Sequence, residues 1–258
     1  MRVAAVYDIH GNLPALEAVL RELRDEKVDR LIVGGDVIPG PLPRECLEAL
    51  LTSEIPAQLI QGNGELAVLA QIDARQTGRV EYWGTVSGKP LPEAVQEVLR
   101  WSAEQIHPDY TSLIHDWPKT LRLRIDALGD VLFCHGTPRS EVECFTRLTP
   151  EEPLRPLFEE LGTSLVVCGH THMQFERMIG SVRVVNAGSI GMPFGRAGAD
   201  WLLLGPDVQL RHTTYDLAKA ADFIRHSSYP QAAPFAETSI LHPPSEESML
   251  EAFTRASF

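Results

Sequence analysis

The sequence predicts an α/β fold, with a largely parallel or mixed β-sheet core that carries helices on its faces. The first observation is that apolar, β-prone runs alternate with segments of helical spacing over the first sixty residues. The second is that a short polar block containing glycine follows each of five apolar runs. Alternating strands and helices with ligand-type residues at strand ends are typical of α/β proteins with a site at one sheet edge.

The amino-terminal part shows this alternation most clearly. Strands are expected at 3–7, 30–34 and 57–61, and helices at 13–27 and 43–52. In the first helix Leu16, Val19, Leu20 and Leu23 recur at helical spacing. Asn12 provides an N-cap. The order strand, polar loop, helix is therefore repeated.

Residues 66–118 interrupt the rhythm with helical stretches at 66–75 and 92–105 and few strand signals. We interpret them as a helical insertion over or beside the polar blocks. An outer helical layer with no role at those blocks is an equally good interpretation.

The strand pattern returns after the insertion. Strands are expected at 121–125, 130–134, 165–168, 181–186, 201–204 and 208–213, and helices at 150–161 and 215–226. The first two strands are expected to form a hairpin around 127–129. We expect one domain over 1–226, followed by a Pro-rich tail at 227–258. The tail is expected to pack on the domain or to be partly irregular, with one short helix at 246–255.

Composition narrows the class of protein. The 258 residues are 44% hydrophobic and 22% charged, as in an ordinary globular domain with a real core. No apolar run approaches the ~20 residues of a membrane span, and the start lacks signal-peptide features, so a cytoplasmic location is expected. The net charge of −12 argues against broad nucleic-acid binding, although Arg139, Arg147, Arg177 and Arg196 leave a local basic patch open.

The four cysteines lack metal-finger spacing. Cys134 and Cys168 end apolar strands, so we interpret them as small buried side chains in a reducing compartment. Their histidine neighbours leave a catalytic thiol as the weaker alternative.

The five polar blocks together supply seven candidate metal ligands. These are Asp8, His10, Asp36, Asn63, His135, His170 and His172. Each of these residues taken alone could instead have a structural role, since a single Asp often caps a turn and a single His often makes a structural hydrogen bond. Carboxylate, amide and imidazole groups gathered at several strand ends are what a two-metal hydrolytic centre needs.

The order of these blocks resembles that of the calcineurin-like metallophosphoesterases, and in particular of their small prokaryotic, phosphodiesterase-like branch. The resemblance rests on Asp8-Ile9-His10, Gly35-Asp36, Gly62-Asn63-Gly64-Glu65, Cys134-His135-Gly136 and Gly169-His170-Thr171-His172. Asn186-Ala187-Gly188-Ser189 adds to it, and the match runs from residue 3 to about 213.

The resemblance implies a four-layer αββα sandwich of two mixed β-sheets and a centre of two divalent transition-metal ions. Asp8, His10, Asp36 and His172 would hold one ion, with Asp36 bridging, and Asn63, His135 and His170 would complete the other site. A hydroxide that bridges the ions would attack phosphorus. Manganese is the first expectation for the metal, with iron, zinc, nickel or cobalt as alternatives.

Gly64 stands where many members of that family carry a histidine that protonates the leaving oxygen. The acid is therefore missing, relocated or unnecessary, and a good leaving group needs none. His10 is a candidate for both ligand and proton donor, and restoring the histidine by Gly64→His suggests itself as the test. Arg139 is a candidate contact for a substrate phosphate, with a surface arginine as the alternative.

The function expected from these observations is hydrolysis of a phosphodiester or phosphoanhydride in a small phosphorylated substrate, with a nucleotide as one option. Asn63, His10 and Arg139 are the expected catalytic residues beside the metal ligands. The alternative is a non-catalytic binding or scaffold protein on the same fold, against which the complete ligand set argues. The oligomeric state stays open, with a homodimer as one option.

Overall fold

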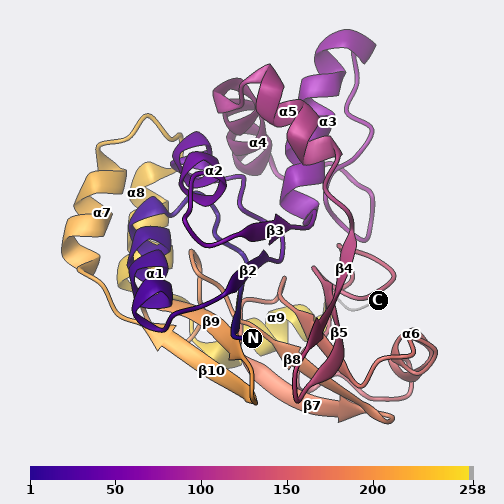
Figure 1. Ribbon diagram of the computed structural model, residues 1–258. Helices are drawn as coiled ribbons and strands as arrows, with labels where there is room; N and C mark the ends of the chain where they lie inside the picture. The colour runs from indigo at the N-terminus through magenta and orange to yellow at the C-terminus, as the bar shows by residue number, and fades with distance from the viewer. Residues whose placement is uncertain (256–258) are drawn as a thin grey trace.

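Two five-stranded sheets form the centre of the computed structural model, which describes residues 1–255 (Figure 1). The first sheet has the order β10-β9-β1-β2-β3. Strands β1, β2 and β3 are parallel to one another, and β9 runs antiparallel to both of its neighbours, β1 and β10. Its strands are β1 Val3–Val6, β2 Arg30–Val33, β3 Ala57–Leu59, β9 Ala199–Leu204 and β10 Val208–Thr213. Both strand directions in one sheet confirm the mixed sheet expected from the sequence.

The second sheet has the order β4-β5-β6-β8-β7, in which β5, β6 and β8 are parallel and β4 and β7 are antiparallel at the edges. Its strands are β4 Thr120–Ile125, β5 Gly129–Cys134, β6 Leu165–Cys168, β7 Phe175–Ile179 and β8 Val182–Asn186. The sequence analysis missed β7, because only its end residues Phe175 and Ile179 are buried apolar side chains. Its pairing with β8 defines it as an edge strand.

Alternation along the strands explains why the sheets stack. Val3, Ala5 and Tyr7 pack between the two sheets, whereas Ala4 and Val6 pack against the helices outside the first sheet. A strand with both faces buried reads as a continuous apolar run. The Tyr7 hydroxyl crosses the gap and donates to the Val167 carbonyl of the second sheet at 3.1 Å.

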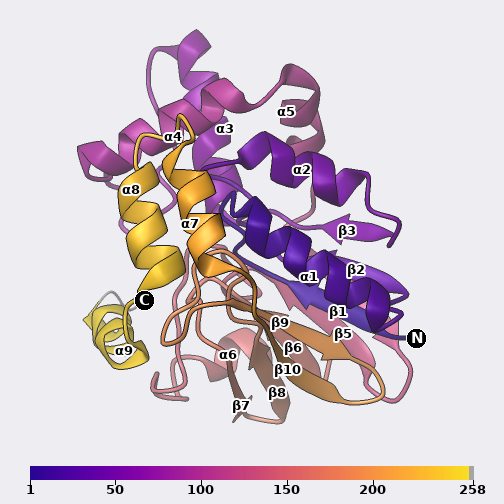
Figure 2. The same cartoon turned by 90° about the vertical axis from the view of Figure 1, so that its left-hand side faces the viewer.

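Helices cover the outer face of the first sheet (Figures 1 and 2). The α-helices before β4 are α1 Leu13–Asp25, α2 Pro43–Leu51, α3 Asn63–Thr77, α4 Glu93–Gln105 and α5 Pro108–His115. The sequence analysis missed α5, which buries only Ile114. Leu99, Ala103 and Ile114 of α4 and α5 belong to the same core cluster as α1 and α2.

The outer face of the second sheet carries a thinner layer. Helix α6 runs only over Arg155–Phe158, so the helix predicted at 150–161 is wrong in length. Pro153 and Pro156 explain this, since proline removes a backbone donor and is tolerated only near a helix start. Phe158 still packs with Phe145 and Phe175 over this face.

The carboxy-terminal region is more regular than the sequence predicted. Helix α7 Leu217–Arg225 is followed by α8 Ala232–Phe235, the π-helix η1 Ala236–Leu241 and α9 Glu246–Arg255. Phe235, Ala236 and Ile240 pack with α7 in one apolar cluster, so this part of the tail packs on the domain, which was one of the two options expected. The last three residues of the proposed tail lie outside the described part.

Within residues 1–255, no helix is both long and apolar enough to cross a bilayer.

Candidate metal centre

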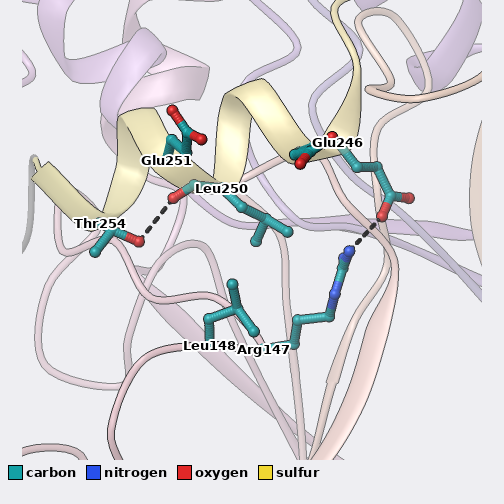
Figure 3. Close-up of a pocket in the computed structure, with 7 residues that line it drawn as sticks. Arg147, Leu148, Glu246, Leu250, Glu251 and Thr254 are labelled. Atoms are coloured by element: carbon teal, nitrogen blue, oxygen red, sulfur yellow. Dashed lines mark hydrogen bonds and ion pairs between the residues drawn. The ribbon is translucent and has the colours of Figure 1, made fainter.

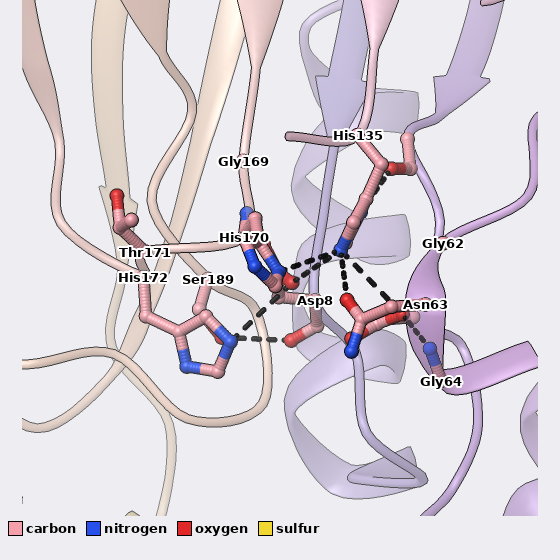
Figure 4. A network of polar contacts seen from close by, with 12 residues as sticks. Asp8, Gly62, Asn63, Gly64, His135, Gly169, His170, Thr171, His172 and Ser189 are labelled. Atoms are coloured by element: carbon pink, nitrogen blue, oxygen red, sulfur yellow. Dashed lines mark hydrogen bonds and ion pairs between the residues drawn. The ribbon is translucent and has the colours of Figure 1, made fainter. Parts of the chain in front are cut away.

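The seven candidate ligands converge where strands of both sheets end. Asp8 and His10 follow β1, Asp36 follows β2 and Asn63 opens α3 after β3. His135 follows β5, and His170 and His172 follow β6. Parallel strands place their carboxyl ends at the same edge, so loops far apart in the sequence meet there (Figure 4).

Their donor atoms form two adjoining clusters. The first contains Asp8, His10 and His172, and the second Asp36, His135 and His170, each with donor atoms within 4.8 Å of one another. Asn63 joins the second cluster, with its Oδ1 2.9 Å from His135 Nε2. Asp36 faces both clusters, since its Oδ2 lies 3.7 Å from His10 Nε2 and its Oδ1 3.5 Å from His135 Nε2.

In the first cluster, backbone carbonyls fix which ring nitrogen carries the proton. His172 Nδ1 lies 2.9 Å from the Met192 carbonyl and His10 Nδ1 lies 3.4 Å from that of Pro39, so each ring donates from Nδ1 when it is neutral. Burial opposes the charged form of His172, but Asp8, followed by Asp36, raises its pKa. The two Nε2 atoms face each other at 3.2 Å, and in the neutral rings both present lone pairs. Two acceptors at this distance repel unless a positive charge lies between them.

The second cluster repeats the arrangement. His135 Nδ1 donates to the Gly34 carbonyl at 2.9 Å, so its Nε2 is an acceptor. Asn63 Nδ2 donates to the Gly84 carbonyl at 3.3 Å, which turns the acceptor Oδ1 towards that same Nε2. His170 Nδ1 lies 3.2 Å from His135 Nε2 on the other side.

Asp8 is the most deeply placed acid in the centre. It is fully buried, and its Oδ1 has no hydrogen-bond partner among the described residues although it lies 3.3 Å from His172 Nε2. A buried acceptor without a donor is unfavourable. Donor atoms about 2.1 Å from one ion lie roughly 3.0–3.4 Å apart, close to the spacings seen here. The side chains therefore fit divalent cations of the transition-metal type.

The ligand loops adopt an unusual backbone conformation. Five of the seven candidates, Asp8, His10, Asp36, His170 and His172, have φ between 47° and 67°. This left-handed region is uncommon for residues other than glycine, and such outliers gather at functional sites. The candidate ligands themselves, and not only glycines such as Gly11 and Gly35 beside them, therefore adopt the left-handed conformation.

Burial and mutual charge shift the acid and imidazole pKa values. Burial opposes the charged form of Asp8, but His172, His135 and His10 together hold its pKa below the usual value. Burial, followed by the charge of Asp8, raises the pKa of Asp36. Burial and the neighbouring His172 lower the pKa of His10 to about 3, which favours a ligand over a proton donor at this position.

Glu65 shapes the loop that carries Asp36. Its carboxylate accepts backbone N–H groups from Asp36 at 2.8 Å, Val37 at 2.7 Å, Ile38 at 3.2 Å and Gly62 at 2.8 Å. Burial and then the charge of Asp36 raise the pKa of Glu65 to about 7. The sequence analysis named Glu65 only as part of the Gly62–Glu65 motif and missed that it holds this loop. The Gly-Asn-x-Glu spacing, typical of a capping box, was the available signal.

Gly64 is enclosed by backbone. A Cβ at this position would lie 2.3 Å from the Ile38 carbonyl oxygen and 2.9 Å from Asp36 Oδ1. The Gly64 amide also donates to Asp36 Oδ1 at 2.7 Å. A histidine here would therefore displace the Asp36 loop, so Gly64→His is not a clean test of a missing general acid.

The four arginines that were considered for a local basic patch contact acidic side chains or backbone carbonyls. Arg139 donates to Glu143, Arg147 pairs with Glu246 at 2.7 Å, and Arg196 lies 3.6 Å from Asp200. Arg177 donates to backbone carbonyls, including that of Thr149 at 2.6 Å. The Arg139 guanidinium is largely exposed and its described hydrogen bonds and ion pairs go to Glu143, so its role towards a substrate stays a prediction.

The thiols do not form part of the centre. Cys134 and Cys168 are buried, and burial raises the pKa of both thiols far above neutrality. A protonated, buried thiol is a poor nucleophile, which favours the structural interpretation.

Residues at the end of β8 and in the loop after it donate hydrogen bonds to the loops that carry the candidate ligands. Asn186 Nδ2 donates to the Gly169 carbonyl at 2.6 Å, and the Ser189 hydroxyl donates to the Asp8 carbonyl at 2.7 Å. Phe194 stacks on the His172 ring with a centroid distance of 5.2 Å. The sequence analysis named 186–189 as part of the family resemblance and missed Phe194.

A cavity of about 660 Å³ lies away from this centre. Helix α9 and the loop at Arg147 and Leu148 line it, and the Arg147–Glu246 ion pair crosses its edge (Figure 3). Its described lining residues include none of the seven candidate ligands.

The fold and the centre together define a two-sheet α/β protein with paired His/Asp clusters at the shared strand edge. Residues 1–205 match the calcineurin-like phosphoesterase superfamily domain. The chain belongs to that superfamily, which confirms the resemblance found in its motifs.

Individual relatives are distant in sequence. The uncharacterized protein MJ0912 of Methanocaldococcus jannaschii is 22% identical over 249 residues, which cover 89% of this chain and 94% of the relative. The crystal structure of the hypothetical protein PH1004 from Pyrococcus horikoshii is similar with a TM-score of 0.75, 19% identity and coverage of 95% of this chain and 99% of that one. The crystal structure of a metallophosphoesterase from Sphaerobacter thermophilus has a TM-score of 0.64, 22% identity and coverage of 98% and 99%. At these identities the similarity establishes the fold.

Proposed function

We propose that this protein is a metal-dependent phosphoesterase that hydrolyses a phosphodiester or phosphoanhydride of a small substrate. The observation that carries the proposal is the convergence of donor atoms into two clusters, in which His10 Nε2 faces His172 Nε2 at 3.2 Å and His135 Nε2 faces Asn63 Oδ1 at 2.9 Å. Membership of the superfamily supports the reaction class, and the buried, unpartnered Oδ1 of Asp8 supports bound cations.

The residues divide between two ions as follows. Asp8, His10 and His172 would hold the first, Asn63, His135 and His170 the second, and Asp36 both, because its two oxygens face different clusters. Two such cations would neutralise phosphoester oxygens and lower the pKa of a water molecule that attacks phosphorus. Nitrogen and oxygen donors without thiolate favour manganese, with iron, zinc, nickel and cobalt as alternatives.

The protein's own contribution is to hold these donors ready. The Met192, Pro39 and Gly34 carbonyls each accept an Nδ1 proton and so leave Nε2 free on three histidines. Glu65 fixes the backbone of the Asp36 loop. A centre organised in this way needs little rearrangement when it binds a phosphate group.

The lack of an acidic side chain at Gly64 favours substrates whose leaving group needs no protonation. A side chain has no room at that position, and its amide is engaged by Asp36. Aryl oxides and phosphate groups leave without protonation, whereas alkyl oxides need an acid. We therefore expect turnover of aryl phosphodiesters and dinucleoside polyphosphates, and weak turnover of alkyl esters.

The test is a substrate screen of metal-depleted protein reloaded with Mn²⁺, Ni²⁺, Zn²⁺ or Mg²⁺. Aryl phosphomonoesters, aryl phosphodiesters, cyclic nucleotides and dinucleoside polyphosphates cover the alternatives. Asp36→Asn should reduce turnover to background with every metal, whereas Asp25→Asn, on the exposed end of α1, should leave it unchanged. Arg139→Ala should raise KM if Arg139 contacts the substrate phosphate.

Two results would contradict the proposal. Turnover retained by Asp36→Asn would remove Asp36 from the centre. Two bound ions without turnover of any substrate in the screen would favour the non-catalytic scaffold instead.

A further inference from the structure

The 78–92 segment, which links α3 to α4, reaches the second cluster from the insertion. Its Gly84 carbonyl accepts the Asn63 Nδ2 proton at 3.3 Å. An amide side chain has one donor end and one acceptor end, and only the oxygen can bind a cation. With Nδ2 held by Gly84, Oδ1 points at His135 Nε2, 2.9 Å away.

A second contact fastens the 78–92 segment to the loop that follows His135. The Tyr82 hydroxyl donates to Glu141 Oε1 at 2.7 Å, and Lys119 Nζ lies 3.3 Å from Glu141 Oε2. Glu141 is only 9% exposed, and burial followed by Glu141 raises the pKa of Tyr82, so the hydroxyl keeps its proton and donates. The 78–92 segment is thus tied to both sides of the second cluster, at Asn63 and beyond His135.

The backbone at Gly84 leaves little freedom in this arrangement. Gly84 has φ +68°, and a Cβ there would lie 3.2 Å from the Asn63 carbonyl oxygen and 3.3 Å from the Ala67 Cβ. A side chain at this position is strained and pushes against the first turn of α3. The close approach is what brings the Gly84 carbonyl within reach of the Asn63 amide.

We propose that the 78–92 segment is a positioning element that selects the amide orientation of Asn63 and so sets the affinity of the second metal ion. The hydrogen bond from Tyr82 to Glu141 holds the segment, and with it the Gly84 carbonyl, in place. This inference rests on the proposed two-metal centre and gives part of the helical insertion a role there.

The experiment is a calorimetric titration of metal-depleted protein with Mn²⁺ alone. Wild type should bind two ions, and Tyr82→Phe should weaken the second by about 10–100-fold, the usual effect of losing a group that orients a ligand. The first ion should keep its affinity within about twofold, because no described contact joins Tyr82 to His10 or His172. Gly84→Ala should act in the same direction.

Two controls separate positioning from general structural damage. Tyr110→Phe removes a similar hydroxyl contact in the same insertion, to Glu48 at 3.3 Å, and should leave both affinities unchanged. In an Asn63→Ala background, Tyr82→Phe should have no further effect, since the group on which it acts is gone.

The outcomes are distinguishable. If wild type binds two ions and Tyr82→Phe binds both with unchanged affinity, or weakens both equally, the inference is overturned and the two-metal centre stands. If wild type itself binds fewer than two ions, the two-metal centre fails and the inference fails with it.

Discussion

Replacing Glu65 with glutamine tests whether one buried carboxylate holds the Asp36 loop. Glu65 accepts four backbone N–H groups, two at each oxygen, and is fully buried. A glutamine keeps one oxygen and therefore two of these hydrogen bonds. Its amide nitrogen presents further donors to the other two N–H groups. Glu65→Gln thus leaves two buried donors without an acceptor and changes the side chain's size very little.

The expected loss follows from these two donors. A buried donor without a partner destabilises the fold by about 1–3 kcal/mol, so two give about 2–6 kcal/mol. Burial, followed by the charge of Asp36, raises the pKa of Glu65 to about 7, which indicates that both effects oppose its ionised form. Removing the charge recovers part of the loss at pH 8, and we expect a decrease of about 2–3 kcal/mol in the free energy of unfolding.

Urea unfolding at pH 8 with a chelator present measures this decrease without any contribution from bound metal. Glu93→Gln is the matched control, since Glu93 lies in the first turn of α4 with its side chain 77% exposed. That change should stay within about 0.5 kcal/mol of wild type. A Glu65→Gln protein as stable as the control would refute the claim that the Glu65 carboxylate stabilises the Asp36 loop.

Two further predictions concern the centre. Saturating Mn²⁺ should raise the midpoint of thermal unfolding by about 5–10 °C per ion at a hundredfold excess over Kd, because the ion relieves repulsion between facing acceptors such as His10 Nε2 and His172 Nε2; no shift in wild type would argue against the site. Gly64→Ala should destabilise the protein by about 1–3 kcal/mol, because its Cβ would overlap the Ile38 carbonyl. Gly78→Ala at the end of α3 meets no atom within 4 Å, so it measures only the effect of a side chain at a left-handed φ of +78° and not the overlap expected at Gly64.

The core strands could be predicted because their burial pattern is local. Val3 to Tyr7 is apolar at every position, since one face meets the helices and the other the second sheet. Strand β7 lacks such a pattern, because Glu176 and Met178 face outwards at a sheet edge. Only its pairing partner β8 makes it a strand, and that partner is a property of the fold rather than of the five residues.

The helices between residues 226 and 246 were missed for a related reason, whereas the helix predicted at 246–255 is confirmed as α9. Proline and serine in this region favour loops when they are considered locally. In the structure Phe235 and Ile240 are buried against α7, and that burial stabilises α8 and η1 in spite of Pro234. Tertiary packing here overrides the weak local propensity.

The candidate ligands could be identified from the sequence, whereas the groups that orient them could not. Asp, Asn and His at strand ends carry a clear chemical signature, and the shared edge of parallel strands implies that they meet. The groups that orient them are mostly backbone carbonyls, at Gly34, Pro39, Gly84 and Met192. Every residue has such a carbonyl, so nothing in the side-chain sequence marks these four.

This division between side-chain ligands and backbone partners explains how strained loops can persist at the centre. Left-handed φ values at five non-glycine candidate ligands cost about 1 kcal/mol each. The loops are held by hydrogen bonds that do not depend on a metal, among them those of Glu65 to the Asp36 loop and of Ser189 to Asp8. The strain is therefore maintained before any ion binds, and the donor atoms are already directed at the two positions where cations would be bound.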